Sequence, residues 1–265
     1  MSIKISITGA SGFVGSSLCK KLKEKKYKLE IIKTKKIKEK NFGKNSSHLI
    51  HLGFDTRRNK CEKNIQLNFL KKIIQNSKKY NFKIIFLSTT CGGPNNKRML
   101  YKINKYQIAK YYCEKELIKH ISSKIEFVIF RVFNLYGPSQ NKKNIIWDIK
   151  KKILNAKNSK IKIIHPKTTR DFIFIDDLVD LILKSIKQKR LHNKIYEVGY
   201  GEEISLAKLY SRIGFFLNKS CDFVFSFPHF DKIDRTKAII KNTKKKFGWK
   251  PKYNLDKGLK KIFNK

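Results

Sequence analysis

Apolar and polar residues alternate along this chain in two repeating patterns, short strand-like runs and longer helix-like runs. The strand-like runs cover residues 3–8, 28–33, 48–52, 83–88, 125–132 and 195–199, and the helix-like runs lie near 13–26, 62–79, 104–121, 144–157, 177–188 and 205–217. Strict alternation of strand and helix predicts an α/β fold with a parallel, doubly wound sheet. Such sheets bind ligands at the carboxyl ends of their strands.

A glycine-rich turn follows the first strand-like run. Residues 8–15 read TGASGFVG, so Gly9, Gly12 and Gly15 recur every three residues in a chain with only 13 glycines. Glycine reaches the positive φ angles of a tight turn, and its bare backbone lets a diphosphate approach the amides at the next helix's N-terminus. The turn therefore predicts a dinucleotide site in a Rossmann-type sheet, and the alternative is a turn that binds nothing.

The composition is that of a globular chain. No apolar run approaches the roughly 18 residues of a membrane span, and the first strand leaves no room for a signal peptide. The five cysteines lack paired short spacings, so we expect neither a disulfide framework nor a metal site. We expect a cytoplasmic protein without membrane insertion.

The formal net charge of +42 raises the question of nucleic-acid binding. Only eight of the 62 basic residues are arginine, and the lysines are spread over the whole chain. No basic block is interleaved with aromatic residues in the manner of a stacking platform. We therefore expect a solvated lysine surface and no specific nucleic-acid partner.

Hydroxyl side chains end the strand-like run at 83–88, and a Tyr-x-x-x-Lys pair follows in the next helix. That spacing occurs four times, at tyrosines 101, 106, 111 and 253. Context favours Tyr106 with Lys110, because Tyr106 lies 17 residues after Thr89 and has Ala109 before the lysine and an acid one turn beyond it. Tyr101 is the rival. A lysine ammonium at about 4 Å supplies the roughly 4 kcal/mol needed to lower a tyrosine pKa by about three units.

The chain resembles the extended short-chain dehydrogenase/reductase family of nucleotide-sugar enzymes. The matching segments are TGASGFVG (8–15), LIHLGF (49–54), STT (88–90), YQIAKYYCE (106–114), RVFNLYGP (131–138), RDFIFIDD (170–177), YEVGYGEEISL (196–206) and FGWKPKYNLDKGL (247–259). The resemblance implies NAD(P), a nucleotide-diphosphate sugar and a catalytic triad of Thr89, Tyr106 and Lys110. It implies cofactor contacts at Gly9, Ser11, Gly12, Phe13, Val14, Gly15, Lys33, Leu52, Gly53, Tyr106 and Lys110, and substrate contacts at Thr90, Cys91, Asn134 and Arg170.

The same resemblance implies how the chain is divided. Residues 1–135 are expected to form mainly the NAD(P)-binding Rossmann domain. Residues 136–265 are expected to be mixed, completing the sheet at about 170–200 and forming a small C-terminal substrate lobe. Residues 34–47 leave no room for a further full strand and helix, because Ile37 and Phe42 are nearly their only apolar side chains.

Departures from the family pattern reduce the number of reactions that we expect this chain to catalyse. Thr90 and Cys91 stand where dehydratases of the family carry an Asp-Glu pair, so we expect no dehydration. Cys91 occupies the place of an epimerising cysteine in GDP-fucose synthases, but its histidine partner is replaced by Asn144. Cys91 is then either a packed small side chain or a catalytic group. The C-terminal half is similar to CDP-abequose synthase, a 4-keto reductase.

The cofactor and diphosphate contacts also depart from the pattern. Lys33, Thr34 and Lys35 stand where NAD-preferring relatives carry an acid, which favours NADP over NAD. The arginine expected near 228–235 for the sugar diphosphate is not clearly placed, since Arg235 falls at an expected helix start.

We expect an NADP-dependent (NAD possible) reductase of a nucleotide-linked 4-keto-6-deoxyhexose, acting as a homodimer. One alternative is a 4-epimerase with the same triad. Another, from a different class, is a non-catalytic dinucleotide sensor or RNA-associated scaffold.

Overall fold

The computed structural model describes residues 3–33, 41–56, 60–90, 104–140, 144–156, 160–227 and 235–263. The chain divides into two compact units. Unit 1 comprises residues 1–132, 179–197 and 245–249, and unit 2 comprises residues 133–178, 198–244 and 250–265.

Unit 1 is built on a six-stranded sheet with the order β2-β1-β3-β4-β5-β9. Its strands are β1 (Lys4–Thr8), β2 (Lys28–Ile32), β3 (Ser46–His51), β4 (Lys83–Thr89), β5 (Phe127–Val132) and β9 (Lys194–Val198). The ladders β1–β2, β1–β3, β3–β4 and β4–β5 are all parallel. The Rossmann-type α/β fold predicted from the alternating pattern is confirmed.

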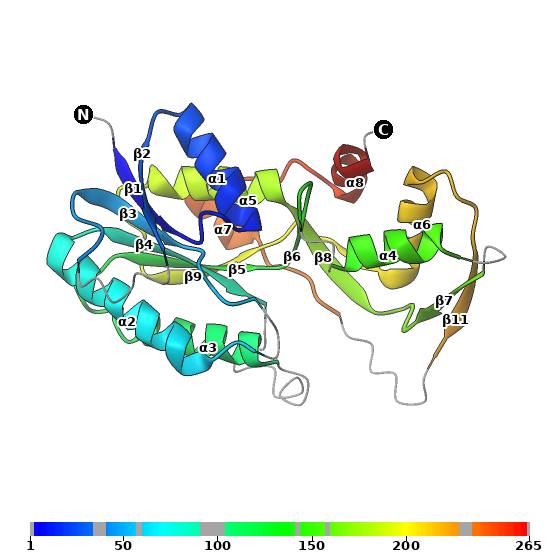
Figure 1. Ribbon diagram of the computed structural model, residues 1–265, viewed down its shortest axis with the longest axis horizontal. Helices are drawn as coiled ribbons and strands as arrows, with labels where there is room; N and C mark the ends of the chain where they lie inside the picture. The colour runs from blue at the N-terminus through cyan, green and yellow to red at the C-terminus, as the bar shows by residue number, and fades with distance from the viewer. Residues whose placement is uncertain are drawn as a thin grey trace. The chain divides into compact units, whose positions relative to one another are not determined.

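Helices cover both faces of this sheet (Figure 1). α2 (Lys63–Tyr80) and α3 (Lys105–Ile118) lie on one face, and α1 (Phe13–Glu24) and α5 (Ile175–Ile186) lie on the other. Because both faces are covered, strands such as β4 are nearly continuously apolar and buried. The core on the α2–α3 face joins apolar side chains of β3, β4 and β5 to those of both helices.

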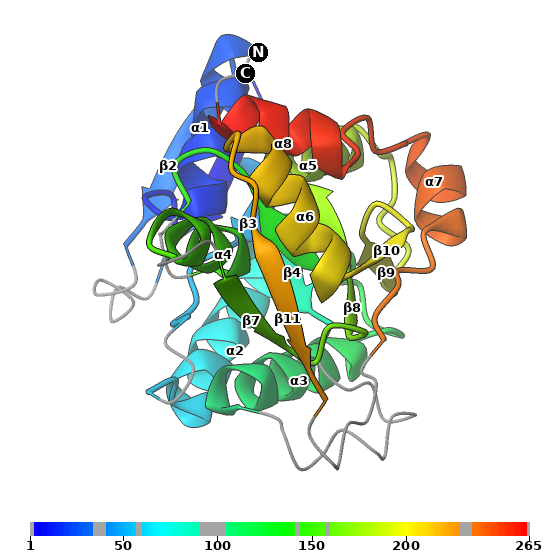
Figure 2. The ribbon, with the colours of Figure 1, turned by 90° about the vertical axis from the view of Figure 1, so that its right-hand side faces the viewer.

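Unit 2 contains a three-stranded and a two-stranded sheet with helices against them (Figure 2). The order β10-β8-β6 combines β10 (Glu203–Ser205), β8 (Thr169–Phe174) and β6 (Asn134–Tyr136), with β6–β8 parallel and β10–β8 antiparallel. β7 (Lys160–Ile164) and β11 (Asp222–Ser226) form a parallel pair. The helices are α4 (Ile145–Leu154), α6 (Leu206–Phe216), α7 (Lys241–Phe247, partly in unit 1) and α8 (Leu255–Phe263).

The elements missed by the sequence pattern are short. The strands β6, β7, β8, β10 and β11 have three to six residues, and lysines alternate with the apolar residues of β7. Such runs carry too few periods to be distinguished from loops.

Candidate active site

The turn between β1 and α1 brings the predicted diphosphate-binding residues together. Gly9 has a φ of +71°, and a Cβ atom there would lie 2.5 Å from the backbone nitrogen of Gly53. Gly15 is buried, and a Cβ atom there would overlap the carbonyl oxygen of Gly9. The fold itself therefore requires these two glycines.

Gly12 differs from the other two glycines of the motif. Its φ of −77° is open to any residue, and a Cβ atom there would lie 3.3 Å from the carbonyl oxygen of Gly9. Gly12 is the exposed N-cap of α1, and the first turn of the helix contains no acidic side chain. The first-turn amides and the helix dipole therefore offer an anion site that a side chain would cover, and the turn fits a dinucleotide diphosphate.

The Thr8 side chain joins the carboxyl ends of β1 and β3. Its hydroxyl accepts hydrogen bonds from the backbone N–H groups of Leu52 (3.1 Å) and Gly53 (2.9 Å) and lies 2.8 Å from Nδ1 of His51. These contacts place Leu52 and Gly53, both predicted to contact the cofactor, beside the glycine turn. Sequence reasoning missed Thr8 and His51, although a histidine inside the apolar run LIHL is a signal.

The His51 imidazole is buried and neutral. Burial lowers the pKa of His51 well below its usual value, and the charge of Lys110 lowers it further. The ring stacks on Phe86, with centroids 5.5 Å apart, and meets Phe69 edge-on at 4.9 Å. Since the Thr8 oxygen already accepts two amide protons, its own proton is available for Nδ1 of the neutral ring.

Helix α3 carries the predicted Tyr–Lys pair. Asn104 starts the helix with a capping box: its side chain accepts from the backbone N–H of Gln107 (3.0 Å), and its own N–H donates to Oε1 of that residue (2.9 Å). Tyr106 and Lys110 follow on one face of the helix. Lys110 is 3% exposed, and its Nζ donates a hydrogen bond to the carbonyl oxygen of Leu87 on β4.

Thr89 is the last residue of β4, two positions after the carbonyl that holds Lys110. Thr89 and Thr90 are both half-buried. β4 therefore carries the predicted threonine and fixes the lysine of the same triad. Cys91 and the rival Tyr101 lie outside the described residues.

Lys33 directly follows β2 and is exposed. β2 is the neighbour of β1, so Lys33 and the glycine turn both lie at carboxyl ends of adjacent strands. An exposed ammonium at this edge can meet an anionic group. Thr34 and Lys35 lie outside the described residues.

Asn134 and Arg170, the two predicted substrate contacts of unit 2, lie on adjacent strands. Asn134 on β6 donates from Nδ2 to the backbone carbonyl oxygen of Asp171 on β8 (2.9 Å). Arg170 is half-buried, and its guanidinium donates to the carbonyl oxygen of Thr169 (2.8 Å). Both side chains are thus fixed by the same strand.

The carboxylate of Asp171 ties β8 to distant segments. It accepts backbone hydrogen bonds from Tyr200 (2.7 Å), Gly201 (2.9 Å) and Ala238 (3.0 Å). Burial raises the pKa of Asp171 to about 6, and the three N–H donors oppose that shift. This carboxyl therefore holds loops in place around the strand that carries Arg170.

Asn144 and Arg235 stand at two family positions that depart from the pattern. Asn144 is the N-cap of α4, where its side chain accepts from the backbone N–H groups of Ile146 (3.0 Å) and Trp147 (3.3 Å). Arg235 is 67% exposed and lies 3.7 Å from a carboxylate oxygen of Glu203. The expectation of a helix start at Arg235 is wrong, since α7 begins at Lys241.

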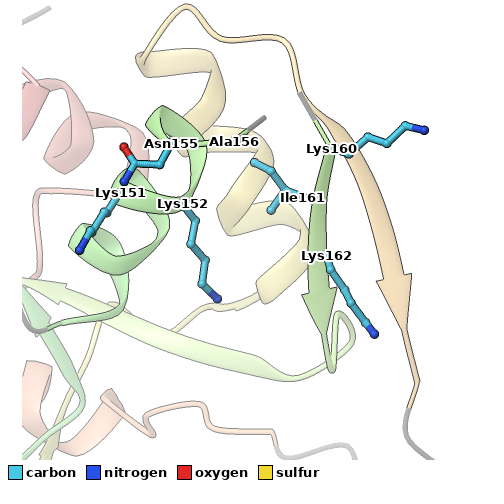
Figure 3. Close-up of a pocket in the computed structure, with 7 residues that line it drawn as sticks. All are labelled: Lys151, Lys152, Asn155, Ala156, Lys160, Ile161 and Lys162. Atoms are coloured by element: carbon cyan, nitrogen blue, oxygen red, sulfur yellow. The ribbon is translucent and has the colours of Figure 1, made fainter. Parts of the chain in front are cut away.

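A pocket of about 370 Å³ lies in unit 2 between α4 and β7 (Figure 3). The lining residues are Lys151, Lys152, Asn155, Ala156, Lys160, Ile161 and Lys162. This lining has four ammonium groups and no carboxylate, so the pocket favours anions. None of the residues predicted from the sequence lines it.

Among the described residues, no group of three or more His, Cys, Asp or Glu side chains could hold a metal ion. Nor is any helix in those ranges long and apolar enough to cross a membrane.

Comparison with known proteins gives a family match and several relatives. The model of the NAD dependent epimerase/dehydratase family matches residues 5–66 and 53–199. A putative UDP-glucose 4-epimerase of Methanocaldococcus jannaschii is 27% identical, over 98% of this chain and 97% of the relative. A dTDP-4-dehydro-6-deoxyglucose reductase of Escherichia coli is 33% identical, over 51% of this chain and 43% of the relative.

The fold is also similar to solved structures. A UDP-glucose 4-epimerase from Thermotoga maritima, solved with UDP-glucose, superposes with a TM-score of 0.82. The two chains are 21% identical, with 99% of this chain and 98% of the other covered. At this identity the likeness supports the fold alone.

Proposed function

Because the chain belongs to the NAD dependent epimerase/dehydratase family, we propose that it reduces the 4-keto group of a nucleoside-diphosphate 4-keto-6-deoxyhexose. The observation that carries the proposal is the placement of Tyr106 and Lys110 on α3, with Lys110 fixed to β4. The relative named as a dTDP-4-dehydro-6-deoxyglucose reductase supports this substrate class.

The cofactor would be held by unit 1. The amides of the glycine turn would bind its diphosphate, and Leu52 and Gly53 would line the neighbouring edge. A bound nicotinamide supplies the hydride for C4. Lys33 would contact a 2′-phosphate, so the proposed cofactor is NADP. A Lys33→Asp variant should then shift its binding preference toward NADH, and an unchanged NADPH/NADH affinity ratio in titrations would remove this argument.

Three side chains of the protein would supply the proton and stabilise the negative charge that develops during the reduction. Tyr106 would donate its phenolic proton to the alkoxide that forms at the C4 oxygen of the sugar. The Lys110 ammonium lowers the cost of the resulting tyrosinate and binds the nicotinamide ribose. Thr89 donates a hydrogen bond to the same substrate oxygen.

Within unit 2, Asn134 and Arg170 are the proposed contacts of the sugar nucleotide, and the proposed contacts within unit 1 are Thr90 and Cys91. An amide and a guanidinium suit sugar hydroxyls and phosphate oxygens. The family position of the histidine partner is Asn144 in this chain, and the Asn144 side chain caps α4. We therefore propose that Cys91 lines the substrate site without acting as an acid or base.

A 4-epimerase is the second candidate, favoured by the relative from M. jannaschii, which matches over 97% of its length. Turnover of 4-keto and 4-hydroxy sugar nucleotides with NADPH deuterated at C4 of the nicotinamide ring distinguishes the two. A reductase consumes one NADPH per product and transfers the deuterium to C4 of the sugar. An epimerase interconverts its substrates without net cofactor consumption. Lack of turnover with any sugar nucleotide would contradict both and favour a dinucleotide sensor.

We also propose that the enzyme is a homodimer. Light scattering coupled to size-exclusion chromatography tests this, and a single species at the 31.2 kDa mass of one chain would exclude it.

A further inference from the structure

Aromatic rings enclose the ammonium group of Lys110. Its Nζ lies 3.9 Å from the ring centroid of Phe54, 4.7 Å from that of Phe86 and 5.8 Å from that of Tyr106. Phe54 also meets Tyr106 edge-on, with centroids 5.6 Å apart and planes at 88°. We call Phe54, Phe86 and Tyr106 the aromatic cage. Phe54 is the member that contacts both Lys110 and Tyr106 without belonging to the Tyr–Lys motif.

The aromatic cage affects where the Lys110 ammonium lies and how strongly its charge acts on neighbouring groups. The Leu87 carbonyl fixes one N–H group of Lys110, and the ring faces of Phe54 and Phe86 attract the cation through their quadrupoles. The rings also exclude water, so the charge is screened less than at the surface. The Phe54 ring lies closest to the ammonium of the three, so its cation–π attraction is the strongest of these contacts.

We propose that Phe54 is a positioning residue whose ring holds the Lys110 ammonium in place beside Tyr106. The inference rests on the roles proposed above for Tyr106 and Lys110. Phe54 lies outside the Tyr–Lys motif, in the segment that follows β3, and would influence the pKa of the proposed proton donor Tyr106. Phe54 acts through Lys110 and takes no part in bond making.

Two further titratable side chains respond to the Lys110 charge. His51 on β3 is neutral because burial holds its pKa well below the usual value. Cys113 on α3 is a protonated thiol because burial raises its pKa to about 12, and it lies near Cys61, also buried. Neither carries charge near neutral pH, and the charge of Lys110 acts on both, together with Glu114 and Glu116 at Cys113.

The test measures the titration of Tyr106 directly, without substrate or cofactor. Tyrosine labelled with ¹³C at Cζ gives one resonance per residue, and the Tyr106→Phe variant assigns the relevant signal. In Phe54→Leu the titration midpoint of Tyr106 should rise by about half a pH unit, as expected for a charge displaced by one to two ångströms. Phe54→Tyr keeps a ring face and should retain the wild-type midpoint.

Phe69→Leu is the matched control, because it makes the same change at a ring that packs on His51. Its Tyr106 midpoint should stay at the wild-type value. Should Phe54→Leu fail to fold, Phe54→Met replaces it with an unbranched, flexible side chain that adapts to the space left by the ring.

Lys110→Met separates this inference from the proposed function. A raised midpoint in Lys110→Met together with an unchanged one in Phe54→Leu would overturn the positioning role and leave the Tyr–Lys pair intact. An unchanged midpoint in Lys110→Met would overturn both. A rise in Phe54→Leu that Phe54→Tyr reverses supports the inference, whether or not a sugar nucleotide is turned over.

Discussion

Arg131 on β5 and Glu114 on α3 form a forked ion pair. The Arg131 Nε atom lies 3.0 Å and 3.1 Å from the two carboxylate oxygens of Glu114, and its Nη2 atom lies 2.6 Å from one of them. The Glu114 side chain is 4% exposed and the Arg131 side chain 22%. Arg131 is paired in register with Ser88, next to Thr89, so the ion pair anchors α3 to β5 beside the carboxyl end of β4.

Breaking this ion pair from one side should be costly. Glu114→Leu leaves a guanidinium without its carboxylate, so the free energy of unfolding should fall by about 3 kcal/mol, at the lower end for buried pairs because Arg131 is partly exposed. Arg131→Met should cost a similar amount. The double variant should recover most of the loss in urea unfolding. If the two single losses simply add, the coupling inferred from the geometry is absent.

Gly12 and Gly15 should respond oppositely to alanine. Gly12→Ala needs only a small shift of the Gly9 carbonyl, so its unfolding midpoint should stay near the wild-type value while NADPH affinity falls. Gly15→Ala forces a Cβ atom into backbone and should lower stability itself. Calorimetric titration and thermal unfolding of both variants check this pair. Unchanged NADPH affinity in a folded Gly12→Val protein would remove the assignment of the turn to the cofactor.

Thr8→Val should weaken the junction of β1 and β3. The valine has the same shape but leaves the Leu52 and Gly53 amides without their hydroxyl acceptor, so we expect a loss of about 1–3 kcal/mol in the free energy of unfolding. Thr8→Ser keeps the hydroxyl and serves as the control. Equal urea midpoints for the valine and serine variants would contradict the role of this hydroxyl.

Tyr106→Phe keeps the ring but removes the proposed proton donor. Turnover of a 4-keto sugar nucleotide should fall by roughly 10²–10⁴, with cofactor binding largely retained. Lys110→Ala should lose both turnover and affinity, because the lysine has two proposed tasks. Tyr101→Phe is the control, and an inactive Tyr101→Phe beside an active Tyr106→Phe would reassign the catalytic tyrosine.

His48 should make stability depend on pH. Burial, followed by the charge of Lys83, lowers the pKa of His48 from 6.5 to about 4. Since the unfolded chain binds the proton first, stability falls as pH drops through 6.5 toward 4, and the full loss from this group is about 3 kcal/mol. His48→Leu should show a smaller acid decline than the wild type in urea unfolding at pH 7, 5.5 and 4. Parallel pH curves for the two proteins would contradict the buried neutral imidazole.

The strand and helix order of the sheet domain follows from the sequence because it depends on local periodicity. Runs such as 83–88 and 104–121 are long enough to show their period, and the structure places β4 and α3 there. The place of the glycine turn is equally local, since it lies between one strand and one helix. Spacing and context selected Tyr106 with Lys110, and the family resemblance added the expected substrate class, which periodicity does not contain.

Tertiary structure alone decided which side chains meet at the candidate site. Thr8 reaches His51 across 43 positions of the chain because β3 pairs directly with β1. Phe54 reaches Lys110 only because the segment after β3 and helix α3 pack on the same sheet. Such contacts depend on strand order and register, which no local pattern encodes. The sequence therefore predicts the reacting groups, while the residues that contact them are decided by long-range packing.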